Sequence, residues 1–437
     1  MKKTLAAFVT VLFITSSFPL PANAAAKVGG ICPVLGKVVV VSGNKLLCSK
    51  SGKKFLWRKS AAVAKPLATP TPTTSASATE VIDTKWYAWS FRANKDGVLE
   101  RKQGGTNTWT VSPTRKGQLV SATRIKAFNE IKAYQKSVDR QVISVNFFFS
   151  SNVDPGVEKA FRRYFNESID FFSARIPTGT SLDVLIATEK DDSFRKETLL
   201  KILGNAYEAE GNFNKDQSTF QQFNTSNPLN SSGGGSVSGT SDTKKYLYTG
   251  AVCSCFASEN LLMYNVAHEV THFYQFSATP TVKKQNFTGT FPNLVEGKIY
   301  IPSTLIEGSA NTLGSALNVD HVGWYSDQMD WHLGRYKRNG LLKSIGSESE
   351  AVKLMKTATT YLPESTGFED LHYVIGQLQF EFFIAKYGMK SYFDLFDNIQ
   401  QSGDFDSAMK KILNISESDF YSAAAEYVMQ AYNSVTS

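Results

Sequence analysis

Long apolar runs are absent from this chain after its first residues. No segment beyond residue 24 approaches the roughly 20 apolar residues that a transmembrane helix needs. The one early apolar stretch, Leu5 to Ile14, is too short to span a bilayer. It follows Lys2 and Lys3, and the segment ends in Ala22-Asn23-Ala24. This pattern predicts a secretory signal peptide over residues 1–24 and an exported, extracellular protein.

Acidic residues are absent from residues 26–65, which contain nine of the 47 lysines and arginines. When these nine residues and the two lysines of the signal peptide are set aside, the rest of the chain has 36 basic and 39 acidic residues. The positive net charge therefore comes from this short segment. Two apolar runs around Ser42-Gly43-Asn44 are typical of a small hairpin, which a disulfide between Cys32 and Cys48 would stabilise in an oxidising compartment. We therefore expect a small basic β module over residues 25–60.

The basic module favours contact with an anionic surface, such as cell-wall polymers or phospholipid headgroups, or else it is a solvated appendage. Nucleic acid is not an expected partner of an exported chain. The run from Gly52 to Trp57 resembles the end of short cysteine-containing basic modules that accompany secreted actinobacterial proteins. Residues 61–82 are rich in Ala, Pro, Thr and Ser, which predicts an extended linker.

About 350 residues follow the linker, more than one compact core usually covers, so we expect two parts, 83–250 and 251–437. The first part predicts a strand, a helix and a strand, and its glycine- and serine-rich segment 225–243 reads as a loop. A strand over Lys244 to Val252 should lie at the edge of the sheet, where a substrate backbone can pair with it. The predicted elements are Val142 to Phe149, Pro155 to Ile176 and Leu182 to Ala187.

The second part is mostly helical in its hydrophobic pattern. The sequence therefore predicts an α+β fold with a small mixed sheet, an edge strand that precedes the helix at 268–272, and a mostly helical C-terminal half. The further helices are expected at 303–316, 321–338, 348–358, 369–386, 389–399 and 415–433.

Histidine is scarce, yet two of the five histidines stand in the string HEVTH at residues 268–272. Residues four apart on a helix project from the same face, so His268 and His272 can coordinate one Zn²⁺ while Glu269 reaches its bound water. This spacing is typical of a metalloprotease, which is a zinc-dependent hydrolase.

A catalytic zinc needs a third protein ligand. Glu307 is favoured, because Ser303 can cap a helix that carries Glu307 one turn before Asn311. Glu296 instead precedes a strand-like run. The residues considered as third ligand are His321, His332, His372, Glu296 and Glu307.

HEVTH followed by the helical string EGSAN at 307–311 resembles the gluzincin superfamily of zinc metallopeptidases, which includes thermolysin-like enzymes and zinc aminopeptidases. The resemblance implies the ligands His268, His272 and Glu307, with Glu269 as general base. Thermolysin-like members have an aspartate where this chain has Asn311, and it orients the first histidine. An amide oxygen can accept the same imidazole N–H, but without the charge of a carboxylate.

A later run, from Tyr373-Val-Ile-Gly376 through Phe383 to Tyr387-Gly388, resembles the helix that follows the zinc glutamate in many gluzincin-like proteins. Family members stabilise the developing oxyanion with a downstream Tyr or His, which implies Tyr373 or His372 in this role. Adjacent helical residues diverge by about 100°, so only one of them can face the metal. A core tyrosine and a surface histidine are the alternative roles of this pair.

Two other classes of function compete with the peptidase. Cys253 and Cys255 with His268 and His272 approach the spacing of a structural Cys₂His₂ zinc site, although one residue between the cysteines is short. In an exported protein the two cysteines are expected to oxidise or to lie on opposite faces of a strand. A non-catalytic cell-envelope binding protein on the same scaffold is the second alternative. We therefore expect a secreted zinc peptidase acting on peptides or proteins, with endo- and aminopeptidase activity both open.

Overall fold

The chain divides into two compact units, Met1–Glu80 and Val81–Ser437. The predicted signal peptide, the predicted linker and the segment that contains Glu296 lie outside the described residues. Among the described helices, none combines the length and apolarity that crossing a membrane requires. The computed structural model describes residues 27, 30–31, 38–41, 44–51, 54–59, 89–93, 99–103, 108–111, 120–221, 235–240, 244–253, 259–278, 301–338, 340, 342–359, 371–402 and 404–435.

The first unit holds a three-stranded antiparallel sheet in the order β1-β2-β3. The predicted hairpin is confirmed, because β1 pairs with β2. Leu46 and Trp57 are buried in this unit. Cys32 and the side chain of Cys48 lie outside the described residues, so their disulfide stays a prediction. The strands are β1 (Val38–Val41), β2 (Asn44–Ser51) and β3 (Lys54–Lys59).

The described residues of the second unit form two sheets, and the expected α+β class with a small mixed sheet is confirmed. The smaller sheet is antiparallel, in the order β4-β5-β6, and packs against α7 through β4. The larger has the order β7-β8-β10-β9, in which only β9 runs antiparallel. The strands are β4 (Trp89–Ala93), β5 (Leu99–Gln103), β6 (Thr110–Val111), β7 (Ser144–Phe149), β8 (Ser181–Ala187), β9 (Gly235–Thr240) and β10 (Lys245–Ala251).

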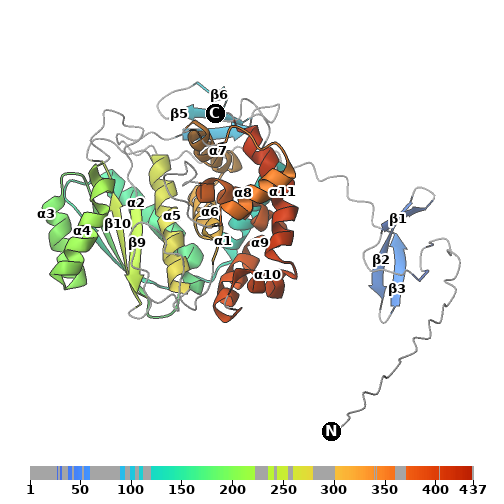
Figure 1. The fold of residues 1–437 in the computed structure, drawn as a ribbon, viewed down its shortest axis with the longest axis horizontal. Helices are drawn as coiled ribbons and strands as arrows, with labels where there is room; N and C mark the ends of the chain where they lie inside the picture. The colour runs from blue at the N-terminus through green and yellow to red at the C-terminus, as the bar shows by residue number, and fades with distance from the viewer. Residues whose placement is uncertain are drawn as a thin grey trace, which may run out of the picture. The chain divides into compact units, whose positions relative to one another are not determined.

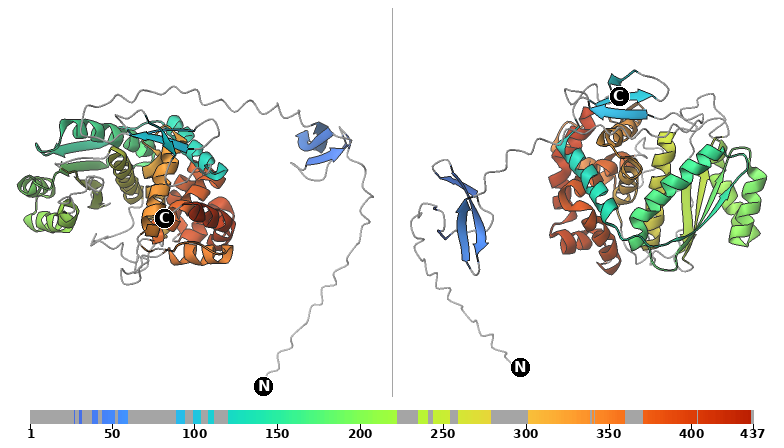
Figure 2. Two further views of the ribbon diagram at one scale, coloured as in Figure 1. Left: turned by 90° about the horizontal axis from the view of Figure 1, so that it is seen from above. Right: turned by 180° about the vertical axis from the view of Figure 1, so that it is seen from behind.

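Side chains of the larger sheet alternate between two cores, as the period of a strand requires. Leu185 and Leu247 pack with α3 and α4 on one face, whereas Tyr246 and Tyr248 pack with α2 and α5 on the other. Helix α5 therefore lies between the sheet and the C-terminal helices (Figures 1 and 2). These helices are α2 (Pro155–Phe172), α3 (Asp192–Leu203), α4 (Ala206–Gln221) and α5 (Glu259–Ala278).

The order of the strands corrects one expectation. The strand predicted at 244–252 is present as β10, but it lies inside the sheet between β8 and β9. The two edge strands of this sheet are β7 and β9, and β9, next to β10, lies in the segment 225–243 that its glycines and serines assign to a loop. A Cβ at Gly235 would lie 2.8 Å from both Glu269 Cγ and Tyr248 Oη. The first residue of the edge strand therefore has to be small because it packs against the helix that carries HEVTH.

The C-terminal half is helical, as expected. The two helices predicted at 369–386 and 389–399 follow one another in α9, with a non-helical Gly388 at φ 82° between them. Four of the described helices were not predicted: α1, α3, α4 and α10. In α1 and α3 the buried residues include Arg124 and Arg195, and these charged residues interrupt the apolar pattern that would indicate a helix. The remaining helices are α1 (Ala122–Ser137), α6 (Ser303–Ala316), α7 (Val322–Arg338), α8 (Glu348–Thr357), α9 (Leu371–Ser402), α10 (Phe405–Leu413) and α11 (Glu417–Ser434).

One hydrophobic core extends from α1 and the larger sheet to α11. The two parts that the sequence separates near residue 250 thus pack into a single unit. Helix α6 is the central element of the helical half: every one of its residues is buried, and it packs against both α5 and α9.

The expected capping role of Ser303 is wrong. Pro302 occupies the N-cap position of α6, without a side-chain cap, and Ser303 is the first helical residue. The Ser303 hydroxyl instead donates to the backbone oxygen of Ala358, at 2.9 Å, just after α8. The Ser303 hydroxyl thus joins the start of α6 to the end of α8. Local sequence patterns do not reveal such a tertiary contact.

Helices α6 and α9 cross at two glycines. A Cβ at Gly308 would lie 2.2 Å from the carbonyl carbon of Gly376, and a Cβ at Gly376 would lie 2.7 Å from the backbone oxygen of Thr304. Both contacts are with backbone atoms, so no side-chain rotation can relieve them. The crossing places Tyr373 of α9 beside Asn311 of α6, whose Nδ2 donates to the Tyr373 backbone oxygen at 3.3 Å.

Gly308→Ala is expected to lower the free energy of unfolding by about 3 kcal/mol, because the added methyl group forces α6 and α9 apart. Urea unfolding followed by circular dichroism measures the change. Gly211→Ala is the matched control, since a Cβ at Gly211 of α4 has no atom within 4 Å. The control should gain about 0.5–1 kcal/mol from the helical preference of alanine. Equal stability of the two variants would refute the tight crossing.

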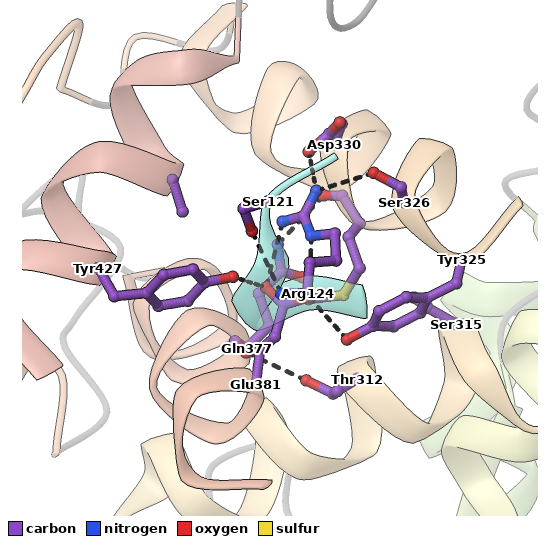
Figure 3. A network of polar contacts seen from close by, with 12 residues as sticks. Ser121, Arg124, Thr312, Ser315, Tyr325, Ser326, Asp330, Gln377, Glu381 and Tyr427 are labelled. Atoms are coloured by element: carbon purple, nitrogen blue, oxygen red, sulfur yellow. Dashed lines mark hydrogen bonds and ion pairs between the residues drawn. The ribbon is translucent and has the colours of Figure 1, made fainter. Parts of the chain in front are cut away.

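A buried ion-pair network joins α1 to α7 and α9 (Figure 3). Arg124 donates to Asp330 Oδ1 at 2.5 Å and to Glu381 Oε1 at 2.8 Å, and all three side chains are fully buried. Burial disfavours the guanidinium charge, but the two carboxylates hold the pKa of Arg124 above its ordinary value. Glu381 also accepts hydrogen bonds from the hydroxyls of Tyr325 and Tyr427. The network thereby fixes α1 to the helices that surround α6.

Candidate metal centre

Three residues from two neighbouring helices converge on one point: His268 and His272 of α5, and Glu307 of α6. His272 Nε2 lies 3.0 Å from His268 Nε2 and 3.2 Å from Glu307 Oε2, and His268 Nε2 lies 3.6 Å from Glu307 Oε2. The side chains of these residues are 12%, 8% and 3% exposed, in sequence order, so the cluster is nearly closed to solvent and opens at His268.

These atoms fit a zinc ion. Tetrahedral zinc has ligand bonds of roughly 2.0–2.2 Å, which puts neighbouring ligand atoms about 3.3–3.6 Å apart. Of the three distances between Nε2 and Oε2 atoms, 3.6 Å lies within this range, and 3.2 and 3.0 Å lie just below it. Two imidazoles and one carboxylate are also the protein ligands of one well-known class of catalytic zinc site, in which a fourth position is left to water.

The electrostatics of the cluster favour a cation. Burial opposes the negative charge of Glu307, but His272 and His268 hold its pKa well below the usual range. Burial also opposes the positive charge of His272, but Glu307 and Glu269 raise the pKa of His272 to about 9. The two carboxylates therefore favour positive charge at the imidazole of His272.

Glu269 lies beside this cluster without belonging to it. It follows His268 in α5, is 9% exposed, and packs against Gly235 at the start of the edge strand β9. Its charge helps to raise the pKa of His272, so its carboxylate lies near the cluster.

Asn311 is present near His268, but Tyr264 stands between the two. The Tyr264 hydroxyl lies 3.4 Å from His268 Nδ1 and donates to Asn311 Oδ1. The expected contact between Asn311 and the first histidine is therefore made through a tyrosine. His272 Nδ1, in turn, lies 2.8 Å from Gln275 Oε1. Tyr264 and Gln275 were not predicted, although helical spacing places them four residues before His268 and three after His272.

The other histidines lie outside the cluster. His321 is at the start of α7, where its Nδ1 accepts from the backbone N–H of Gly323. His332 stacks near Tyr264, with ring centroids 4.3 Å apart, and burial, Arg335 and His268 lower its pKa to about 3. His332 is therefore a neutral packing partner behind the site.

Tyr373 and His372 begin α9 side by side, with ring centroids 4.3 Å apart. Burial raises the pKa of Tyr373 well above its usual value, and the charges of Glu307 and Glu269 raise it further. Both carboxylates of the site are therefore close enough to influence the charge state of Tyr373. The side chain of His372 is buried, with 3% of its surface exposed. Of these two residues, Tyr373 is the one whose pKa responds to the carboxylates of the site.

The cysteine part of the alternative zinc site is not available for a metal. Cys253, two residues after β10, is disulfide-bonded and buried, and Cys255 lies outside the described residues. Because a disulfide sulfur is not a thiolate ligand, a structural Cys₂His₂ site does not fit this chain.

Comparison with known proteins adds no family to these observations. A scan against protein-family models gives no match, and searches of curated proteins and of solved structures find no similar protein. A functional conclusion therefore depends on the geometry of the site.

Proposed function

We propose that this protein is a zinc-dependent peptidase of the gluzincin type. The observation that carries the proposal is the convergence of His268, His272 and Glu307, with Glu269 next to them at the edge strand. A helix pair supplies all three ligands, so the site is held by the packing of α5 on α6. Preorganised ligands on rigid elements are what a catalytic metal site requires.

Each residue has a distinct task in this proposal. His268, His272 and Glu307 hold the ion, which when bound supplies Lewis-acid polarisation of a peptide carbonyl and of a water molecule. Glu269 takes a proton from the attacking water and passes it to the leaving amine. Tyr373 donates a hydrogen bond to the oxygen on which charge develops. The edge strand β9 offers backbone groups to an extended peptide next to Glu269.

We also propose that the chain is exported and that residues 26–65 contact an anionic polymer or headgroup of the cell envelope. Nine positive charges without an acidic residue support this surface role. Peptides or proteins outside the cell would then be the substrates.

Removal of the metal tests the proposal directly. We expect the purified protein to contain one zinc ion per chain and to cleave members of a peptide library, with cleavage falling to background after chelation and returning with zinc. Elemental analysis and mass spectrometry of the cleavage products measure both. Cleavage that persists after complete loss of the metal would disprove the mechanism, and a chain that binds no metal would disprove the site.

A further inference from the structure

Each histidine of the cluster directs Nε2 at the cluster and Nδ1 at a chain of neutral hydrogen-bonding groups. This arrangement extends the proposed function. His268 Nδ1, on the side of the ring away from Nε2, lies 3.4 Å from the Tyr264 hydroxyl. The hydroxyl donates to Asn311 Oδ1, and Asn311 Nδ2 lies 3.3 Å from the backbone oxygen of Tyr373. The chain therefore runs from α5 through α6 to the start of α9.

The direction of every bond in this chain is set from its far end. A backbone carbonyl only accepts, so the amide nitrogen of Asn311 faces Tyr373 and the amide oxygen faces Tyr264. The single proton of the Tyr264 hydroxyl goes to that oxygen, which leaves the hydroxyl to accept from His268. His268 consequently carries its proton on Nδ1 and keeps the lone pair of Nε2 for the cluster.

A second chain repeats this logic at His272. Gln275 Nε2 donates to the backbone oxygen of Ile306 at 2.9 Å and to Ser309 Oγ at 2.8 Å. The oxygen of the Gln275 amide therefore faces His272 Nδ1, at 2.8 Å, and accepts a hydrogen bond from its N–H. Both imidazoles present Nε2 to Glu307, and neither is backed by a carboxylate in these two chains.

Packing holds Tyr264 in place for this task. A Cβ at Gly314 of α6 would lie 3.1 Å from two carbons of the Tyr264 ring, so a larger residue there would push the ring by a few tenths of an ångström. The ring of His332 lies against it from α7. The tyrosine is thus fixed on two sides, with its hydroxyl directed at the narrow gap between His268 and Asn311.

From these contacts we propose that Tyr264 is the positioning residue of His268, that Asn311 acts on His268 only through Tyr264, and that Gln275 does the same for His272 directly. The inference rests on the proposed metal site. It differs from a carboxylate behind the histidine, because neutral groups orient the ring without adding negative charge to the site. Tyr264 itself does not touch a reacting atom.

Tyr264→Phe is the test, with Co²⁺ and Zn²⁺ affinities measured by competition with a chromophoric chelator at fixed pH. We expect the affinity to fall about 10–100-fold, the range found when a partner of a metal-binding histidine is removed. The visible spectrum of the Co²⁺ form should change as well, since His268 is free to turn. Tyr432→Phe is the matched control, because it removes a buried tyrosine hydroxyl of α11 that donates to the backbone oxygen of Leu342 and to no residue of the cluster.

Asn311→Ala, alone and combined with Tyr264→Phe in a double variant, tests whether Asn311 acts on His268 through Tyr264. The double variant should bind as weakly as Tyr264→Phe alone, since Asn311 has no separate path to His268. Melting temperatures of the metal-free proteins identify a merely structural effect, which would lower stability and leave affinity unchanged. Unchanged affinity and spectrum in Tyr264→Phe, in a wild type that binds zinc and cleaves peptides, would overturn the inference alone. Weakened binding in a protein that cleaves no peptide would support it and overturn the proposed function, and a wild type that binds neither ion would overturn both.

Discussion

Glu269→Gln is expected to retain one zinc ion per chain and to cleave peptides about 10³-fold more slowly than the wild type. The amide has nearly the shape of the carboxylate, so the packing against Gly235 and Tyr248 stays, but it cannot accept a proton from water. Steady-state kcat/KM on a library-derived peptide and elemental analysis of the same sample measure the two properties together.

Two further variants separate this role from others. Glu307→Gln should lose zinc as well as activity, because it removes the only carboxylate of the described metal cluster. Glu197→Gln, an exposed glutamate of α3, should change neither property. If Glu269→Gln cleaves at the wild-type rate with its zinc in place, Glu269 is not the base and the mechanism fails.

Arg124→Met is expected to lower the free energy of unfolding by about 3–5 kcal/mol, because it leaves Asp330 and Glu381 buried without their cation. The network lies among α1, α7 and α9, so its loss should also loosen the helices around α6 (Figure 3). The midpoint and slope of urea unfolding of the metal-free protein give the change.

Arg140→Met provides the comparison with an exposed pair. Arg140 lies 2.9 Å from Asp170, but its side chain is 68% exposed, and water screens the interaction. We expect this variant to lose less than about 1 kcal/mol. A similar loss in both variants would show that burial of the Arg124 network adds nothing to stability.

The residues that carry the proposed chemistry are recognisable in the sequence for a local reason. His268, Glu269 and His272 lie within five residues, and one helix fixes their relative directions once it forms. Glu307 could be selected on the same ground, since it lies on a predicted helix, whereas Glu296 precedes a strand-like run. The structure brings Glu307 to within 3.2 Å of His272 Nε2.

Residues whose role depends on packing between elements were missed or misassigned. Gly235 and its neighbours resemble a loop, yet they form an edge strand because β10 offers them a partner. Ser303 has a side chain that can cap a helix, but its hydroxyl donates a hydrogen bond to the nearby backbone oxygen of Ala358 instead. Arg124 of α1 was not singled out, because the two carboxylates that make its burial favourable are distant in the chain.

The sequence by itself determined the helix that carries HEVTH, the α+β class and the helical C-terminal half, because these follow from periodicities within single elements. Only the tertiary structure decided which strand forms the edge, how closely α6 approaches α9, and that Tyr264 lies between His268 and Asn311. Each of these depends on contacts between residues far apart in the chain, whose partners no local pattern specifies.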